Sequence, residues 1–537
     1  MSPVIEHDRV TVDRGDRARR ARFPARTPAW ITLLTVSLLL LGASWAVSSP
    51  IGSSPDDDFH LASIWCSPPA PDDLCEPGTE SLSEGQRSVI VPAPVGPRTG
   101  CFAFDATKSA SCQIGIREGA RSSSRANDGL YPGGYYVLMG PLAGNHPIVS
   151  ALLMRVVAWI LAVGLIAGAA LVARPALRRT YLLSVLVTSV PLAIFLFASN
   201  NPSGLAIAGV GAFWCSALAF MQPSSRLRHQ GAAVVGLAAS ALALSSRSDA
   251  GLYIAASAAC VVVMERGWRA ERRWKSVALA APALVGVAMV LSSGQTSSTT
   301  DGSIALDLRG PWTSALWYNI VNLPALWTGS LGTRGLGWLD TRMPDVVSAT
   351  MIAATGFLLL CSLVSWDRLK VIAVVVAAVP LTVVPLFVLN ANHNLVGEFV
   401  QPRYLLPMIP VLLAVVLVPA GGRRGARLSA AQLKTIGTLL VIAHTTALHA
   451  NIRRYVTGQD VLSPDLDANV EWWWDIGVIK PSHVWLVGSV AFAAVVYLCF
   501  TRCLMADPVR SSVPEPSRRH AAQVSGRPRS TVARAGA

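Results

Sequence analysis

The chain reads AWITLLTVSLLLLGASWAVS over residues 29–48. An apolar run of this length crosses the hydrocarbon core of a bilayer as an α-helix, because about 20 residues rise about 30 Å. Similar runs recur along most of the chain. The other predicted spans are 148–173, 180–199, 203–221, 231–246, 250–264, 277–293, 345–365, 371–390, 405–420, 435–450 and 481–500. The sequence therefore predicts an all-α integral membrane protein with about 12 transmembrane helices.

The overall composition supports this class. The chain has 537 residues, of which 52% are hydrophobic and only 14% are charged, and its mean hydropathy is +0.46. The core of a soluble protein of this size cannot hide so much apolar surface, so a membrane must cover the rest. We attribute the net charge of +14 to membrane topology and to attraction for anionic lipid headgroups, and we expect no nucleic-acid partner.

The positions of Lys and Arg predict the orientation. The first span follows an arginine-rich segment, but it is longer than the apolar region of a secretory signal and precedes a weak cleavage site. We therefore interpret it as a retained helix. With the N-terminus in the cytoplasm, the segments on that side hold 30 of the 45 Lys and Arg residues, although the exterior segments are longer in total. The positive-inside rule thus predicts that both termini are cytoplasmic.

The predicted membrane domain covers residues 29–500. A basic cytoplasmic segment, 1–28, precedes it, and a basic, disordered cytoplasmic tail, 501–537, follows it. The long connections lie on the exterior side. The predicted exterior loops are 49–147, 294–344, 391–404 and 451–480. Loops that a rigid scaffold positions carry function in many proteins, so we expect the working face to be exterior.

Four cysteines cluster in the exterior loop after the first span. They are Cys66, Cys75, Cys101 and Cys112. An exterior loop lies in an oxidising compartment, where four clustered cysteines predict two disulfide bonds with three possible connectivities. A zinc site is the alternative, but the loop contains no CxxC pair, so we favour disulfides.

The sequence PDDDFH at residues 55–60 places three carboxylates and a histidine just beyond the first span. Crowding these groups is costly unless a cation, solvent or chemistry uses them. If a short helix starts here, Asp56 and His60 share one face, while Asp57 points elsewhere. Such a carboxylate can take a proton from a hydroxyl nucleophile, and Asp56 with Asp57 could bind a divalent cation such as Mg²⁺ or Mn²⁺. The alternative is a solvated acidic turn that caps the helix.

Other polar residues near the exterior face are candidates for anion binding. Arg403 and Tyr404 belong to the sequence QPRY, which leads into a later span. An arginine at a membrane surface suits a phosphate, because its planar fork donates two hydrogen bonds. Arg454 and Asp340, in the sequences RRY and GWLD, are additional candidates. Each arginine could instead extend to the lipid headgroups. Arg155 lies inside the second span, so it should face the bundle interior or a hydrated cavity, unless its side chain extends outward to the membrane surface.

Five motifs, in this order, resemble those of a bacterial membrane-protein family called domain of unknown function 2142. They are PDDDFH at 55–60, YPGGYY at 131–136, NPSG at 201–204, GWLD at 337–340 and QPRY at 401–404. Each motif is weak alone, but the ordered set is specific, and the resemblance runs from about residue 30 to residue 500. It implies a multi-pass protein of the bacterial plasma membrane.

The motifs depart from the family pattern at two positions. The family's acidic pair is Asp-Glu, whereas this chain has Asp56 and Asp57, so the second carboxylate has a shorter reach. In the family's Gln-Gly-Arg-Tyr sequence, Pro402 replaces the glycine. Proline fixes the backbone and has no N–H, so it removes any contact that this N–H would make.

The family in turn resembles the class-C glycosyltransferases, multi-spanning enzymes that use polyprenyl-phosphate sugars. This resemblance implies catalytic roles for Asp56, as the base that takes the proton of an acceptor hydroxyl, and for Asp57. It implies that Arg403, His60 and Tyr404 bind the phosphate of the donor. The implied reaction moves a sugar to an envelope glycan or protein with inversion, and a groove between helices holds the lipid tail.

Two functions of other classes stay open. One is a transporter or flippase for an envelope lipid or polysaccharide, since many helices with charges near the membrane surface also suit transport. The other is a non-catalytic envelope-assembly protein. The large cysteine-bearing loop and the acidic cluster outside the membrane favour transfer over transport.

Overall fold

A computed structural model of the protein describes residues 28–293, 312–363, 366–398, 400–419, 428–474 and 478–504. The predicted basic segments at the two ends of the chain fall mostly outside these residues. So does the first part of the exterior loop predicted at 294–344.

Within the described residues, eight helices are long and apolar enough to cross a membrane. They are α1 (Ala29–Val47), α4 (Pro147–Val172), α7 (Ser203–Met221), α8 (Arg226–Ser246), α10 (Arg273–Ser292), α13 (Asp345–Ser362), α14 (Arg368–Ala391) and α18 (Pro481–Leu498). A helix satisfies its own backbone hydrogen bonds, so such segments are stable in lipid. The prediction of a mostly helical membrane protein is confirmed, whereas the number of twelve spans is not.

The other four predicted spans are also helical, but they are shorter or more polar. The predicted span at 180–199 divides into two helices, because Pro191 lacks the N–H that would continue the first one. The helices in these four regions are α5 (Pro175–Ser189), α6 (Leu192–Phe197), α9 (Ala250–Met264), α16 (Ile409–Leu417) and α17 (Ala430–Val456). Three further short helices are α11 (Trp312–Asn322), α12 (Pro324–Thr328) and α15 (Pro402–Leu405).

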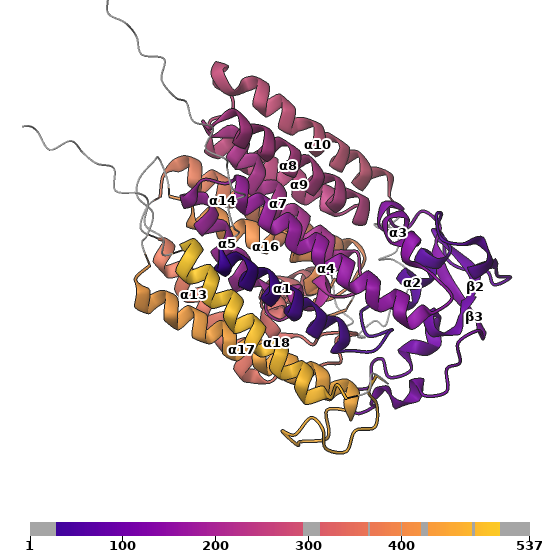
Figure 1. The fold of residues 1–537 in the computed structure, drawn as a ribbon. Coiled ribbons are helices and arrows are strands. Elements are labelled where there is room, and N and C mark those ends of the chain that lie inside the picture. Colours follow the sequence, from indigo (N-terminus) through magenta and orange to yellow (C-terminus); the bar gives the residue numbers. More distant parts are fainter. Residues whose placement is uncertain are drawn as a thin grey trace, which may run out of the picture.

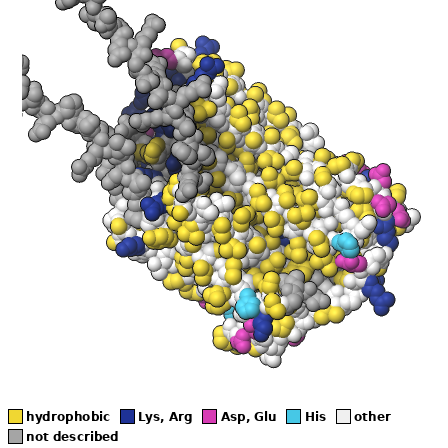
Figure 2. Space-filling model, in the orientation of Figure 1, with side chains coloured by type: hydrophobic (Ala, Val, Ile, Leu, Met, Phe, Trp, Pro, Cys, Tyr) yellow, Lys and Arg dark blue, Asp and Glu magenta, His cyan; other side chains and the backbone are white. Residues whose placement is uncertain are grey.

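The long helices lie side by side in one bundle, with a smaller lobe at one end (Figure 1). Helix α1 packs against α4 and α18, α17 contacts α13 and α18, and α9 contacts α7, α10 and α14. In Figure 2, hydrophobic side chains cover the flank of the bundle, whereas charged side chains gather at its ends. Such an apolar belt suits the hydrocarbon core of a membrane, so a lipid bilayer is the partner that the fold supports.

The lobe is the segment between α1 and α4, which the sequence predicts as an exterior loop. It contains α2 (Asp57–Trp65), α3 (Gly134–Met139) and the strands β1 (Glu76–Pro77), β2 (Gln86–Pro92) and β3 (Arg121–Asn127). The strands form an antiparallel sheet in the order β1-β2-β3, with Val89 opposite Ser124. The prediction of an all-α chain is therefore incorrect for this segment. Strand β3 consists mostly of serines and arginines, so it lacks the alternation of apolar and polar residues that predicts a strand.

Two disulfide bonds stabilise the lobe, Cys66–Cys75 and Cys101–Cys112. The prediction of disulfides is confirmed, and the structure selects one of the three connectivities. The paired cysteines are 9 and 11 residues apart in the sequence, so both bonds constrain local loops. Cys66 directly follows α2, and the first bond therefore anchors the end of the helix that starts at the acidic cluster.

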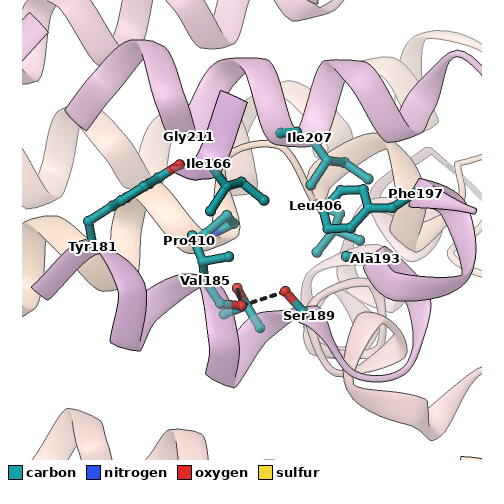
Figure 3. Close-up of a pocket in the computed structure, with 12 residues that line it drawn as sticks. Ile166, Tyr181, Val185, Ser189, Ala193, Phe197, Ile207, Gly211, Leu406 and Pro410 are labelled. Atoms are coloured by element: carbon teal, nitrogen blue, oxygen red, sulfur yellow. Dashed lines mark hydrogen bonds between the residues drawn. The ribbon is translucent and has the colours of Figure 1, made fainter. Parts of the chain in front are cut away.

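The interior of the bundle is closely packed. A pocket among α4, α5, α7 and α16 has a cavity volume of about 10 Å³ (Figure 3). Apolar side chains such as Ile166, Val185 and Leu406 line it. A cavity of this size holds one water molecule at most, so it is a packing gap and not a ligand site.

Candidate functional site

The acidic cluster lies at the turn between α1 and α2, where the lobe meets the bundle. Asp56 directly precedes α2 and has a left-handed backbone conformation, with φ of 60°. This conformation costs roughly 1–2 kcal/mol for most residues, but Asp and Asn tolerate it better. At this turn the side chains of Asp56 and Asp57 face different partners.

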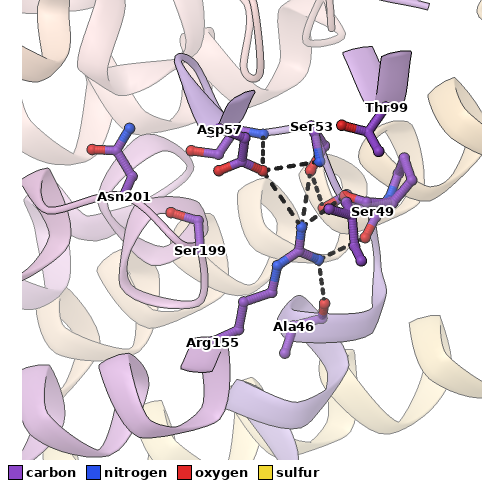
Figure 4. A network of polar contacts seen from close by, with 12 residues as sticks. Ala46, Ser49, Ser53, Asp57, Thr99, Arg155, Ser199 and Asn201 are labelled. Atoms are coloured by element: carbon purple, nitrogen blue, oxygen red, sulfur yellow. Dashed lines mark hydrogen bonds and ion pairs between the residues drawn. The ribbon is translucent and has the colours of Figure 1, made fainter. Parts of the chain in front are cut away.

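Asp57 lies beneath the turn and is fully buried. Its Oδ2 accepts hydrogen bonds from the backbone N–H groups of Gly52 (3.1 Å) and Ser54 (3.2 Å), and Nη2 of Arg155 is 3.8 Å away. Figure 4 shows this network, in which the guanidinium of Arg155 reaches from α4 to the turn. Burial raises the pKa of the Asp57 carboxyl to about 7, although Arg155 and the two N–H groups oppose the shift. In this geometry Asp57 is enclosed by the protein and holds the turn through its two backbone hydrogen bonds.

Arg155 also caps the end of α1. Its guanidinium donates hydrogen bonds to the carbonyl oxygens of Ala46 (2.8 Å), Ser49 (2.7 Å) and Pro50 (2.7 Å). The last carbonyls of a helix lack partners within it and carry partial negative charge, so a cation stabilises them. Only 1% of Arg155 is exposed, which confirms the expectation that it faces the interior.

Asp56 pairs with an arginine that is 347 positions away in the sequence. Its Oδ2 accepts a hydrogen bond from Nη2 of Arg403 at 2.6 Å, and its Oδ1 lies 3.6 Å from Nη2 of Arg125 on β3. Burial acts to raise the pKa of the Asp56 carboxyl, but Arg403, His60 and Arg125 lower it overall. The side chain keeps 28% of its surface exposed. Asp56 is therefore an ionised and accessible carboxylate between two guanidinium groups.

Arg403 lies on α15 and is almost fully buried. Pro402 occupies the first position of this helix, where a missing N–H costs nothing, so the departure from the family pattern is compatible with the fold. Nη2 of Arg403 also donates to the Tyr404 hydroxyl at 3.1 Å. Among the described residues, its Nε and Nη1 have no hydrogen-bond partner. Unused donors on a buried guanidinium are costly, and a bound anion would satisfy them.

His60 lies one turn after Asp56 and is almost fully buried. Its Nδ1 is 3.1 Å from the Tyr136 hydroxyl, and its ring packs edge-on against Tyr131. Burial lowers the pKa of His60 to about 3, so the ring is neutral at neutral pH. A neutral imidazole adds no positive charge to a phosphate site, and its contacts suit a residue that orients its neighbours.

A cavity of about 440 Å³ lies between α9, α10 and α14. Its apolar walls include Leu252 on α9, Val290 on α10 and Val384 on α14. Tyr404, the sequence neighbour of Arg403, lines one end of it. The cavity therefore combines apolar walls from α9, α10 and α14 with a polar end beside the Asp56–Arg403 pair.

Arg247 lines the same polar end, at the turn between α8 and α9. Two hydrogen bonds join its guanidinium to the Asp249 carboxylate, at 2.9 and 2.7 Å. Its guanidinium carbon is 4.8 Å from the centre of the Tyr404 ring, and that of Arg403 is 5.1 Å from the same ring. The two arginines therefore share one aromatic neighbour, which links the cavity to Asp56.

Arg454 and Asp340, the additional candidates from the sequence, form a separate buried ion pair, with Nη2 and Oδ2 2.8 Å apart. Arg454 also donates hydrogen bonds to the carbonyl oxygens of Phe102 and Asp105, in the loop that the Cys101–Cys112 bond closes. The pair thus joins α17 to the lobe, and these contacts indicate a structural role.

The predicted cation ligands do not fit a shared metal ion. Asp56 and Asp57 face different arginines, Arg403 and Arg155. A Mg²⁺ or Mn²⁺ ion needs several oxygen ligands around one point. In the part of the chain that the structure describes, no three His, Cys, Asp or Glu side chains gather in a metal-binding arrangement.

The sequence as a whole matches a known family. A family model described as "Predicted membrane protein (DUF2142)" covers residues 39–412. The chain belongs to this family. The family resemblance inferred from the ordered motifs is thereby confirmed, and the DUF2142 region contains the acidic cluster, Arg247 and Arg403. No curated protein and no solved structure matches the chain.

Two arginines at the site of this DUF2142 protein lie outside the recognised motifs. Arg125 belongs to β3, whose sequence RSSSRAN carries no clear strand signal. Arg247 follows an apolar helix and precedes Asp249 by two residues. Ionisable residues at membrane depth are rare and often mark functional sites, and Arg247 and Asp249 lie directly beside the predicted spans 231–246 and 250–264. That signal could have identified Arg247 from the sequence.

Proposed function

We propose that the protein is an inverting glycosyltransferase of the bacterial plasma membrane. It would move a sugar from a polyprenyl-phosphate donor to a hydroxyl group of an envelope glycan or protein. The observation that carries the proposal is the contact of 2.6 Å between Asp56 and Arg403. It brings together a carboxylate, which can accept a proton, and a guanidinium, which can bind a phosphate.

In the proposed reaction, the oxygen of the acceptor hydroxyl attacks the anomeric carbon of the sugar. The bond between this carbon and the phosphate oxygen breaks, and its electron pair leaves with the lipid phosphate. Asp56 accepts the proton of the attacking hydroxyl, and Arg403 stabilises the charge that develops on the phosphate. Direct displacement of this kind inverts the anomeric centre.

The surroundings of the two residues support these roles. Asp56 is ionised and keeps 28% of its side chain exposed, so a hydroxyl can reach it. Arg403 keeps two unused donors, Nε and Nη1. The adjacent cavity of about 440 Å³ has apolar walls suited to an isoprenoid chain. The lobe above the site is the part of the protein that would select the acceptor on the exterior side.

The proposal is tested with purified protein and a polyprenyl-phosphate sugar, by measuring sugar transfer or release. Asn tolerates a left-handed backbone, so Asp56→Asn removes the charge of the carboxylate with little strain. We expect this variant to be about 100-fold slower or more, the usual contribution of a general base. The control is Asp72→Asn, which removes an exposed carboxylate of the lobe and should keep the wild-type rate. Equal rates in all three proteins would contradict the proposal.

A further inference from the structure

Arg403 and Arg247 lie against the same tyrosine ring, that of Tyr404. Both are buried, with 4% and 5% of their surfaces exposed. Two like charges near each other repel more strongly when water is excluded than they do in solution. Their proximity is stable only when anions neutralise both guanidinium groups.

Two carboxylates supply these anions in the structure, and they are held differently. Asp249 lies two positions from Arg247 and uses both of its oxygens on that guanidinium. Asp56 offers a single oxygen to Arg403, and its other oxygen lies near Arg125. Since Nε and Nη1 of Arg403 have no partner among the described residues, Arg403 is the guanidinium with donors left for another anion.

The cavity beside these arginines indicates the chemistry of that anion. Arg247, Tyr131 and Tyr404 line its polar end. Apolar side chains of α9, α10 and α14 line much of the remainder, together with a few polar residues such as Ser293 and Asn392. A free phosphate ion would contact the polar end alone. A molecule with a phosphate head and a hydrocarbon chain would contact both parts, so the cavity suits a lipid phosphate.

We infer that Arg403 binds the phosphate group of a lipid monophosphate beside Tyr404, with Arg247 as a second positive charge next to it, and that this phosphate displaces Asp56 from Arg403. The inference rests on the proposed function for the identity of the lipid. It adds Arg247 to the phosphate site and makes Asp56 the counterion that the ligand replaces. The carboxylate is then released to act on an acceptor only after the donor has bound.

Asp56 and the lipid phosphate compete for the guanidinium of Arg403. Removing a negative charge and removing a positive charge at this site should therefore change the affinity for phosphate in opposite directions. Removing the negative charge of Asp56 should strengthen phosphate binding, whereas removing the positive charge of Arg403 or Arg247 should weaken it. A damaged fold can lose binding but does not gain it. Tighter binding by Asp56→Asn therefore cannot result from misfolding.

The test uses the full-length protein in detergent, titrated with a polyprenyl monophosphate and followed by native mass spectrometry. One charged contact changes affinity about tenfold or more, so Asp56→Asn should bind about tenfold tighter. Arg403→Gln and Arg247→Gln should each bind about tenfold weaker. Arg342→Gln, at an exposed arginine outside the cavity, should bind as the wild type does.

Several results would overturn the inference. Unchanged or weaker binding by Asp56→Asn would exclude displacement, and wild-type affinity of Arg247→Gln would exclude Arg247 from the site. Inorganic phosphate that binds as tightly as the polyprenyl monophosphate would exclude a role for the apolar walls. If the lipid phosphate binds as expected but no sugar is transferred, the binding site is upheld and the transferase proposal fails.

Discussion

Asp56 and Asp57 are adjacent in the sequence, yet their surroundings give them opposite properties. The accessible Asp56 lies between two guanidinium groups, which lower the pKa of its carboxyl despite partial burial. The buried Asp57 faces one guanidinium at 3.8 Å, and desolvation raises the pKa of its carboxyl to about 7. Carboxylates that titrate apart in this way usually serve different roles. We therefore propose proton transfer as the role of Asp56 and positioning of the turn as the role of Asp57.

The positioning role of Asp57 predicts a specific dependence of stability on pH. The pKa of Asp57 is about 7 in the folded protein, against 3.8 for an ordinary Asp, so the folded state binds this proton more tightly. The resulting stabilisation is present below about pH 4 and is lost as the pH rises to about 7. An asparagine at this position does not titrate. Asp57→Asn should therefore gain stability relative to the wild type as the pH rises from about 4 to about 7.

Thermal unfolding in detergent at several pH values measures this difference. The lowered pKa of His60 makes stability rise with pH over part of the same range, but this effect is present in both proteins and cancels in the comparison. Arg155, Asp58 and Tyr135 also interact with Asp57 and are unchanged in the variant. A difference in Tm that stays constant with pH would show that Asp57 does not titrate in this range.

At the residue scale, the motifs singled out Asp56 and Arg403, and the structure brings these two into contact. The sequence could not separate the role of Asp56 from that of Asp57. That separation depends on the left-handed backbone at Asp56 and on Arg155, which comes from a different helix. Neither feature has a signal in the local sequence.

Among the helices, the contact between α9 and α10 determines one wall of the cavity. Gly251 on α9 and Gly286 on α10 meet directly: a Cβ at Gly286 would lie 2.7 Å from the Cα of Gly251. Glycine allows two helix backbones in a membrane to approach this closely. The wall that Leu252 and Val290 form therefore depends on two positions without side chains.

We expect Gly286→Ala to destabilise the protein by about 1–3 kcal/mol, because the added methyl group overpacks this contact. Thermal unfolding should show a lower Tm, and binding of a lipid phosphate in the cavity should weaken. Gly356→Ala is the matched control, since no atom lies within 4 Å of a Cβ at this position of α13. The control should be neutral or slightly stabilising, because Ala favours a helix over Gly. Equal Tm values for the two variants would contradict the importance of the contact.

Helix α14 shows why membrane spans were easier to predict from the sequence than the contacts between helices. It contains Pro380 and Pro385, yet its hydropathy still predicts a span, and the segment is one continuous helix long enough to cross a membrane. Pro385 removes the N–H that would bond the carbonyl of Leu381, and the indole Nε1 of Trp327 on α12 donates to that carbonyl instead, at 2.8 Å. Hydropathy predicts that a segment is buried in lipid. It does not predict the side chain from another helix that replaces a missing bond.

The whole molecule has two unlike ends separated by an apolar flank. The lobe occupies one end, where acidic and basic side chains are both visible, whereas the charged side chains visible at the opposite end are mostly Lys and Arg (Figures 1 and 2). The positive-inside rule predicts that the basic end faces the cytoplasm and that the lobe faces outward. The proposed chemistry at Asp56 would then take place on the exterior side.

Labelling of introduced cysteines with a membrane-impermeant maleimide in intact cells tests this orientation. Leu462 is 92% exposed and lies in the predicted exterior loop 451–480, whereas Arg228 is an exposed residue at the start of α8 on the predicted cytoplasmic side. We expect Leu462→Cys to be labelled and Arg228→Cys to be labelled only after the cells are permeabilised. The reverse pattern would place the lobe in the cytoplasm.

At this largest scale, composition and hydropathy predicted the membrane class, and the clustered cysteines predicted the disulfides. Such local signals did not predict the sheet of the lobe. They also did not predict that three arginines, Arg125, Arg247 and Arg403, lie around one site. These arrangements depend on contacts between residues far apart in the chain, such as the 347 positions between Asp56 and Arg403. Local patterns in one sequence do not encode such pairings.

The left-handed backbone at position 56 has a consequence for selection experiments. Gly, Asn and Asp are the residues that accept a φ near 60° with least strain, and only Asp among them carries a charge. A random library selected for folded protein alone should therefore recover all three residues at this position. A library selected for activity should recover Asp alone. Comparing the two libraries therefore distinguishes the residues that the backbone conformation allows from the residue that the proposed reaction requires.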